Sequence, residues 1–198
     1  MDYRSCIPSQ IAYPFLSSLD NKELSMGMVS NPRTRVGAKF AKITSPKDED
    51  LLDLGEMFAV IVNGLPYYNA IAKNSEISKY QPGSLAAAIK GDPDFAQIAR
   101  VDGELAGFCF SQKDDGLIWL SWFGVSPKYR RQGIGRALLA ALERRARSCR
   151  SHKIWCDSRT DNAPSCNLLN RSGFRPICKV TNHWYGQDFI LWERYIGY

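Results

Sequence analysis

The chain has 198 residues, of which 44% are hydrophobic and 23% charged, and a formal net charge of +6. This length suits one domain with one core, and the composition excludes a disordered or fibrous protein. The positive charge is concentrated, because segment 128–153 holds nine lysines and arginines against the single acid Glu143. A compact polyanion bound at one place explains this asymmetry as well as a nucleic acid does.

Cysteine and histidine usage argues against a disulfide framework and a metal site. The six cysteines form no CxxC pair, and His152 and His183 stand alone without an acidic cluster. No signal-peptide pattern opens the sequence, and the apolar stretch 58–62 is too short to span a bilayer. We therefore expect a cytoplasmic protein that needs no metal and no membrane partner.

The first half of the chain is predicted to begin with an extension and continue into the domain. Residues 1–36 show no helical or strand periodicity, so the domain is expected over 37–198. Ser45 and Asp48 precede a helical pattern and suggest its start. We expect a strand over 39–43 and an amphipathic helix over 51–61. One or two short helices, broken by Pro82 and Gly83, are expected over 64–90.

The second half alternates strands and helices. Asp102 and Gly103 separate two apolar runs, which is a strong hairpin signal, and a third strand follows. A helix, a strand, a helix capped by Gly173 and two strands complete an αβββαβαββ order counted from the first helix. The predicted strands are 97–101, 105–111, 116–125, 153–157, 174–180 and 189–194, and the predicted helices are 134–149 and 162–171.

The most informative segment runs from a strand through a glycine-punctuated loop into a helix. Gly133 and Gly135 let the backbone approach a ligand, and the first amides of the helix lack intrahelical partners. The helix dipole makes these amides an anion site. Because Arg130, Arg131 and Arg136 add charge for phosphate oxygens, the segment predicts a pyrophosphate site.

For an isolated Gly-x-Gly motif, two turn glycines beside a solvated arginine face would be the favoured explanation, so the surrounding sequence has to decide between the two interpretations. The sequence resembles the GNAT superfamily of N-acyltransferases, whose coenzyme A loop has Arg or Gln, two residues, Gly, one residue, then Gly or Ala. Arg130, Gly133 and Gly135 fit this pattern in register. Asn162 and Ser165 match the family's second coenzyme-proximal helix, and the resemblance extends over about residues 39–194.

The resemblance implies an α/β (α+β) fold with a mixed, mostly antiparallel central sheet, helices on both faces, and a splay between the fourth and fifth strands. It implies transfer of an acetyl group from acetyl-coenzyme A directly to a primary amine. The pantetheine arm would pair with backbone on the fourth strand. The residues that the resemblance assigns to coenzyme A are Phe123, Val125, Arg130, Arg131, Gln132, Gly133, Ile134, Gly135, Arg136, Asn162 and Ser165.

The residues for proton transfer do not carry over. Several relatives have a carboxylate on the fourth strand, which here reads Ile-Trp-Leu-Ser-Trp over 118–122, and Leu169 stands where many have a tyrosine. Asp157 and Tyr185 remain candidates against a purely structural role, so the catalytic residues stay unassigned. The aromatic residues that would line an acceptor pocket, or else the core, are Trp119, Trp122, Phe123, Trp155, Trp184 and Tyr185.

Three functions follow from these patterns. The leading hypothesis is an N-acetyltransferase acting on a small-molecule or protein amine. The alternative is an inactive or weakly active acyl-coenzyme A-binding module of the same fold. The third, nucleic-acid binding through the basic segment, is disfavoured by the motif. Whether residues 1–36 shape the acceptor pocket or mediate a homodimer is left open.

Overall fold

The computed structural model describes residues 41–197, which belong to the unit Gly37–Tyr198. The extension expected over 1–36 and the start of the strand expected over 39–43 lie outside the described residues. The strands are β1 (Lys42–Thr44), β2 (Ala96–Val101), β3 (Glu104–Asp114), β4 (Leu117–Val125), β5 (Lys153–Arg159), β6 (Arg175–Val180) and β7 (Phe189–Tyr195). The helices are α1 (Leu51–Asn63), α2 (Ala70–Lys79), α3 (Pro82–Gly91), α4 (Ile134–Ser148) and α5 (Ala163–Arg171).

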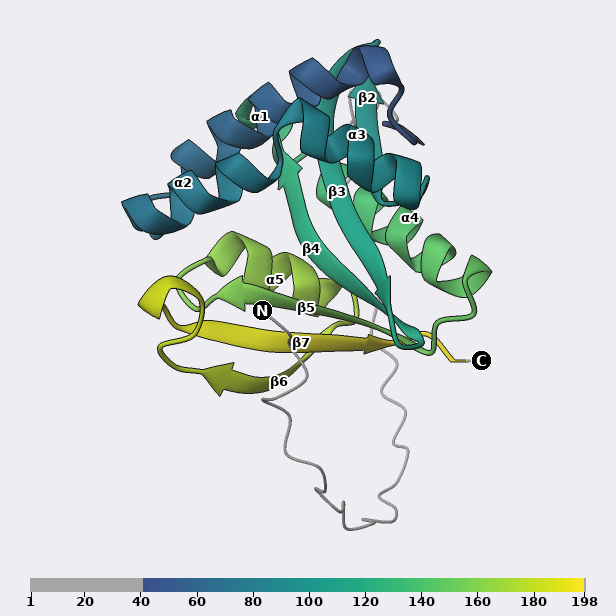
Figure 1. Ribbon diagram of the computed structural model, residues 1–198. Coiled ribbons are helices and arrows are strands. Elements are labelled where there is room, and N and C mark those ends of the chain that lie inside the picture. Colours follow the sequence, from purple (N-terminus) through teal and green to yellow (C-terminus); the bar gives the residue numbers. More distant parts are fainter. Residues whose placement is uncertain (1–40, 198) are drawn as a thin grey trace, which may run out of the picture. The chain divides into compact units, whose positions relative to one another are not determined.

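The strands form one sheet in the order β1-β2-β3-β4-β5-β7-β6, in which β4 and β5 are parallel and all other neighbours antiparallel (Figure 1). The β2–β3 hairpin turns at Asp102 and Gly103, both with positive φ, as the Asp-Gly step predicts. Asp115 and Gly116 make a second such turn between β3 and β4. Segment 64–90 contains two helices, and Pro82 is the first residue of α3.

Helices cover both faces of the sheet, which confirms the predicted fold class (Figure 1). Alternate residues of each strand face opposite sides. Ile98 and Phe108 pack with α1 and α3, whereas Ala99 and Cys109 pack with α4 and α5. Leu138 and Leu142 of α4 are fully buried.

The sheet opens between β4 and β5, as predicted. Parallel pairing runs from Leu117 opposite Lys153 to Leu120 opposite Cys156 and then stops. Beyond Leu120, β4 continues to pair with β3 alone, and beyond Cys156, β5 pairs with β7 alone. Figure 1 shows the two strands adjacent at one end and diverging toward the other. The backbone edges in this splay are therefore available to a ligand.

Candidate active site

The loop before α4 has the backbone geometry of an anion site. Arg131 and Gly133 adopt left-handed conformations with φ of 64° and 84°, and Gly133 is the N-cap of α4. No side chain caps the helix there, and its first turn contains no acidic residue. The amides of Ile134, Gly135 and Arg136 thus begin the helix without a capping side chain, at the positive end of the dipole. This geometry suits a pyrophosphate.

The side chains around this loop are exposed and basic. Arg130, Arg131, Gln132 and Arg136 are all exposed to solvent. Arg130 Nε donates to the Val125 carbonyl at 3.3 Å, which holds this guanidinium beside the end of β4. The remaining donors of Arg130 are suited to phosphate oxygens.

The basic segment includes one arginine with a different role. Arg145 is buried, donates to both oxygens of Ser111, and pairs with Asp92 at 2.5 Å. It anchors the last turns of α4 to the sheet and to the end of α3. Its charge therefore serves the fold, so the positive charge concentrated in this segment is not wholly available to a ligand.

The splayed edge of β4 presents the main-chain groups of Phe123 and Val125. Ser126 donates its amide to the Ala106 carbonyl at 2.9 Å, and Gly107 lies opposite Val125. Because hydrogen-bonded and non-bonded pairs alternate in an antiparallel ladder, Phe123 and Val125 direct their amides and carbonyls away from β3. These two groups face the splay, where the resemblance places pantetheine.

Two of the loop residues predicted to bind coenzyme A also pack inside the fold. Ile134 is buried in the core, so only its main chain can meet a ligand. A Cβ added to Gly135 would lie 2.8 Å from Leu168 Cδ2 of α5 and 3.8 Å from a methyl of Val125. Gly135 is thus required where α4 approaches α5, and a bulky residue there would disturb this packing as well as any cofactor contact.

Asn162 and Ser165 lie together at the start of α5. The Asn162 side chain is the N-cap and accepts the Ser165 amide at 3.1 Å. This cap fixes the first turn of α5 on the β5 side of the splay. The structure accounts for both residues by capping, and their contact with coenzyme A remains a prediction.

On the opposite side of the splay lies a carboxylate in aromatic surroundings. Asp157 is the first residue of β5 beyond the last parallel pair, and its Oδ2 accepts the indole N–H of Trp184 at 2.7 Å. Burial raises the pKa of Asp157 to about 6, the Trp184 bond opposes this, and the charge of Glu76 adds to it. A group with such a pKa exchanges protons near neutral pH.

A second carboxylate, Glu76 of α2, is buried behind β4. Its oxygens accept hydrogen bonds from Trp122 Nε1 at 2.8 Å, Tyr185 OH at 2.6 Å and Lys79 Nζ at 2.6 Å. Burial, and then the charges of Asp157 and Glu76, raise the phenol pKa of Tyr68. Glu76 and its three donors thus form a polar cluster, whose negative charge also acts on Asp157.

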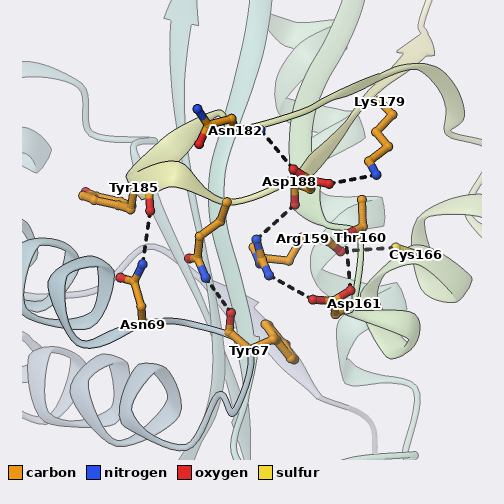
Figure 2. Close-up of polar contacts among 11 residues, drawn as sticks. Tyr67, Asn69, Arg159, Thr160, Asp161, Cys166, Lys179, Asn182, Tyr185 and Asp188 are labelled. Carbon is orange, nitrogen blue, oxygen red and sulfur yellow. Dashed lines mark hydrogen bonds and ion pairs between the residues drawn. The ribbon is translucent and has the colours of Figure 1, made fainter.

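Two hydrogen bonds join segment 67–69, which leads into α2, to segment 185–187, which leads into β7. Asn69 Nδ2 donates to the Tyr185 carbonyl at 3.1 Å, as Figure 2 shows, and Gln187 Nε2 donates to the Tyr67 carbonyl at 2.9 Å. Tyr185 has a left-handed φ of 55°, and its phenol oxygen lies 2.9 Å from Ser75 Oγ. Residues held in such sparsely populated conformations are frequent at functional sites.

The aromatic residues proposed for the acceptor pocket divide into groups. Trp122, Trp184 and Tyr185 gather around the two acids through the bonds given above. Trp119 and Trp155 lie opposite each other in the paired part of β4 and β5, before the splay. Phe123 packs against the core on the α4 side.

Sequence reasoning missed Glu76 and the link between Trp184 and Asp157. No local signal marks either, because both depend on contacts across long sequence separations. Leu169, at the position where many relatives have a tyrosine, is fully buried in the core. Within residues 41–197 no cluster of metal-ligating side chains is present, and none of the helices there is long and apolar enough to cross a membrane.

The fold and the site together define a protein with a splayed sheet and an uncapped, basic helix start for an anionic ligand. Residues 66–174, more than half of the chain, match the Acetyltransferase (GNAT) family. The chain therefore belongs to this family, which confirms the resemblance seen in the sequence.

Individual proteins are similar to this chain to different extents. An N-alpha-acetyltransferase from Sulfurisphaera tokodaii is 30% identical over 109 residues, covering 48% of this chain and 65% of the relative, just under two thirds of its length. The PaiA N-acetyltransferase from Thermoplasma acidophilum, solved in complex with coenzyme A, superposes with a TM-score of 0.67 at 20% identity, covering 79% and 99% of the two chains.

A further solved structure shares the fold. The ribosomal-protein-S18-alanine N-acetyltransferase from Escherichia coli has a TM-score of 0.61 at 22% identity, covering 80% of this chain and 96% of its own. At these identities the two solved structures establish the architecture and leave the chemistry of this chain to its own residues.

Proposed function

We propose that residues 37–198 form an N-acetyltransferase domain that transfers the acetyl group of acetyl-coenzyme A to a primary amine. The observation that carries the proposal is the uncapped start of α4 beside the splayed edge of β4. These features suit a long ligand with a pyrophosphate at one end and a hydrogen-bonding arm at the other. Acetyl-coenzyme A has this chemistry and supplies the acyl group as a thioester.

The loop and the strand would hold this cosubstrate in two ways. The amides at the start of α4 and the side chains of Arg130, Arg131 and Arg136 would bind the pyrophosphate, with Gln132 completing the loop. Phe123 and Val125 would bind the arm through their main chain and direct the thioester toward Asp157.

In the reaction the amine nitrogen forms a bond to the thioester carbonyl carbon, and the carbon–sulfur bond breaks to release the thiolate. The amine must first lose a proton. Asp157 is the group we assign to accept it, because it lies at the opening of the splay with a pKa of about 6. The proton stays on its carboxylate until it is returned to the thiolate or to solvent.

The similar N-alpha-acetyltransferase acts, by its name, on α-amino groups, which supports an amine acceptor here. The second candidate function, an acyl-coenzyme A-binding module without turnover, is favoured by Leu169, which is fully buried and carries no acidic proton for the leaving thiolate. Release of coenzyme A by the purified protein in the presence of an amine would exclude this second function.

Calorimetric titration with acetyl-coenzyme A tests the cofactor half of the proposal, with Arg136→Glu as the variant. The new acid would stand in the first turn of α4, where the helix dipole favours it, so the fold should be retained. Binding should weaken by about tenfold or more, because a cation beside the pyrophosphate becomes an anion.

Arg144→Glu is the matched control, since Arg144 is exposed on the same helix, two turns away from Arg136. It changes the net charge equally and should leave the affinity within about twofold, because exposed charges this far apart are largely screened. Equal weakening by both variants would point to a general charge effect and contradict the proposed pyrophosphate site.

A further inference from the structure

The segment between β6 and β7 is held in place by polar contacts. None of residues 182–188 is buried, and none belongs to either hydrophobic core. Asn182 and Tyr185 have left-handed backbone conformations, with φ of 51° and 55°. This conformation is unfavourable for a tyrosine, so contacts with the rest of the domain must hold the segment in it.

The phenol of Tyr185 forms the strongest of these contacts. Its hydroxyl donates to Glu76 Oε1 at 2.6 Å and accepts a hydrogen bond from Lys79 Nζ at 3.0 Å. Glu76 is buried on α2 and also accepts from Trp122 Nε1 of β4 at 2.8 Å. The hydroxyl is therefore bonded to a charged acceptor that is itself fixed to the sheet, and such bonds are stronger than those between neutral groups.

Two amide side chains make weaker contacts with the connection between α1 and α2. Asn69 Nδ2 donates to the Tyr185 carbonyl at 3.1 Å, and Gln187 Nε2 donates to the Tyr67 carbonyl at 2.9 Å (Figure 2). Both acceptors are neutral, and the Asn69 bond is exposed to solvent. Hydrogen bonds of this kind add little net stability, so the segment is held at one strong point and two weak ones.

In this position the segment places an indole against the Asp157 carboxylate. Trp184 Nε1 donates to Asp157 Oδ2 at 2.7 Å, and the His183 ring packs on the indole with ring centroids 4.4 Å apart. Asp157 is the first residue of β5 beyond the last parallel pair, at the opening of the splay. A molecule that bonds to this oxygen in the place of Trp184 must therefore displace the indole and the segment that carries it.

We propose that segment 182–188 is a lid over Asp157, with the Tyr185 hydroxyl as the latch that keeps it closed. The structure shows the closed state, with Trp184 on Asp157. When the bond between Tyr185 and Glu76 breaks, the segment is free to move away with its indole, because none of its residues is buried. This inference goes beyond the proposed function: in the proposed transferase the lid would control when the amine reaches Asp157, but its motion needs no turnover.

Tyr185→Phe tests the latch, because it removes the hydroxyl and keeps the ring. Hydrogen exchange of the full chain without ligands, followed by mass spectrometry, reports lid opening. Two bonds enclose the strained Tyr185 backbone and should break as it relaxes: His183 N to Gln187 O at 2.8 Å and Gln187 N to Trp184 O at 3.0 Å. Loss of a hydrogen bond to a charged acceptor should increase the open population, and with it exchange over 182–188, by about tenfold or more.

Tyr195→Phe is the matched control, since it makes the same change in a side chain that is 60% exposed on β7, outside the lid. Exchange over 182–188 should stay within about twofold of the wild type in this variant. Gln187→Met removes the bond to the Tyr67 carbonyl and should speed exchange by about threefold to fivefold, because this bond joins neutral groups. This second lid variant carries the test if Tyr185→Phe fails to fold.

Chemical labelling of carboxyl groups shows whether the lid covers Asp157. A carbodiimide with glycine ethyl ester converts accessible carboxyls to amides, and Asp161, whose side chain is 63% exposed, serves as the internal standard. Relative to Asp161, Asp157 should be labelled about tenfold faster in Tyr185→Phe than in the wild type, because the reagent reaches the carboxylate more often once Trp184 has left it.

Three results would overturn the inference. Unchanged exchange over 182–188 in Tyr185→Phe would show that the hydroxyl is not a latch, and unchanged labelling of Asp157 would show that the segment does not cover it. Faster exchange that extends to β3 and α4 would show that Tyr185 supports the whole fold. Neither measurement uses acetyl-coenzyme A or an amine, so failure of the lid leaves the proposed transferase standing, and failure of coenzyme A release leaves the lid standing.

Discussion

Replacing Asp157 by asparagine should make the protein more stable and less active at the same time. Asp157 has a pKa of about 6 in the folded protein against an ordinary value of 3.8, so its ionised form is less favourable in the folded state than in the unfolded state. At about 1.36 kcal/mol per pH unit, this difference destabilises the folded protein by about 3 kcal/mol once the group is ionised.

The pH dependence has a defined direction. Well below pH 3.8 Asp157 is protonated in the folded and the unfolded protein, so its ionisation does not change the free energy of unfolding. The destabilisation of the folded protein grows as the pH rises and is complete above about pH 6. Asp157→Asn removes the charge while its amide oxygen can still accept from Trp184. At pH 8 the variant should therefore melt up to about 6–12 °C higher than the wild type, and at pH 4 the difference should shrink to about 1–2 °C.

Calorimetric or circular-dichroism melts across pH 4–8 measure this stability difference, and coenzyme A release measures activity. The activity of Asp157→Asn should fall by about a hundredfold to ten-thousandfold if the carboxylate removes the amine proton. A variant that is less stable at pH 8 and retains its activity would refute both the electrostatics and the catalytic assignment. Such a residue would be a structural one.

Two further changes test the surroundings of the site. Trp184→Phe removes the hydrogen bond that lowers the Asp157 pKa. The acidic limb of the plot of kcat/KM against pH should therefore move to higher pH by as much as about one unit. If this limb does not move, a group other than Asp157 titrates there. Gly107→Ala places a Cβ 2.6 Å from the Gly124 carbonyl in the closely spaced β3–β4 pair and should lower stability by about 1–3 kcal/mol in denaturant melts. Gly91→Ala, whose Cβ would meet nothing within 4 Å, should leave stability nearly unchanged, and equal effects of the two glycine changes would contradict this packing argument.

The backbone geometry of the loop before α4 could be predicted from the sequence because its determinants are local. Gly133 and the arginines near it lie within seven consecutive residues, and the uncapped, basic helix start follows from helix geometry and backbone conformation, whereas its role in coenzyme A binding stays a prediction. The splay was expected from the resemblance alone, since a strand pattern does not show where pairing with a neighbour stops. The position of β7 between β5 and β6 likewise depends on pairing over the whole sheet.

The cluster around Asp157 and Glu76, which we propose faces the acceptor, could not be predicted because it is assembled from distant segments. Glu76 on α2, Trp122 on β4 and Tyr185 before β7 meet through side-chain bonds that span 46 and 109 residues of sequence. Segment 64–90 carries weak periodicity, so even the helix that bears Glu76 was uncertain. Asp157 was a candidate by position, but its raised pKa results from burial and from Glu76, which no local pattern reveals.

The splay places two opposite charge environments on either side of one gap in the sheet. The start of α4 offers arginines and amides without a capping side chain, which suit an anionic ligand, whereas the other side offers Asp157, with which no cation of residues 41–197 is paired. An ammonium is repelled by the first environment and attracted by the second, and a pyrophosphate behaves in the opposite way. In the proposed transferase, each substrate would thereby be excluded from the other's place. The same charges would then set the orientation in which the amine and the thioester meet.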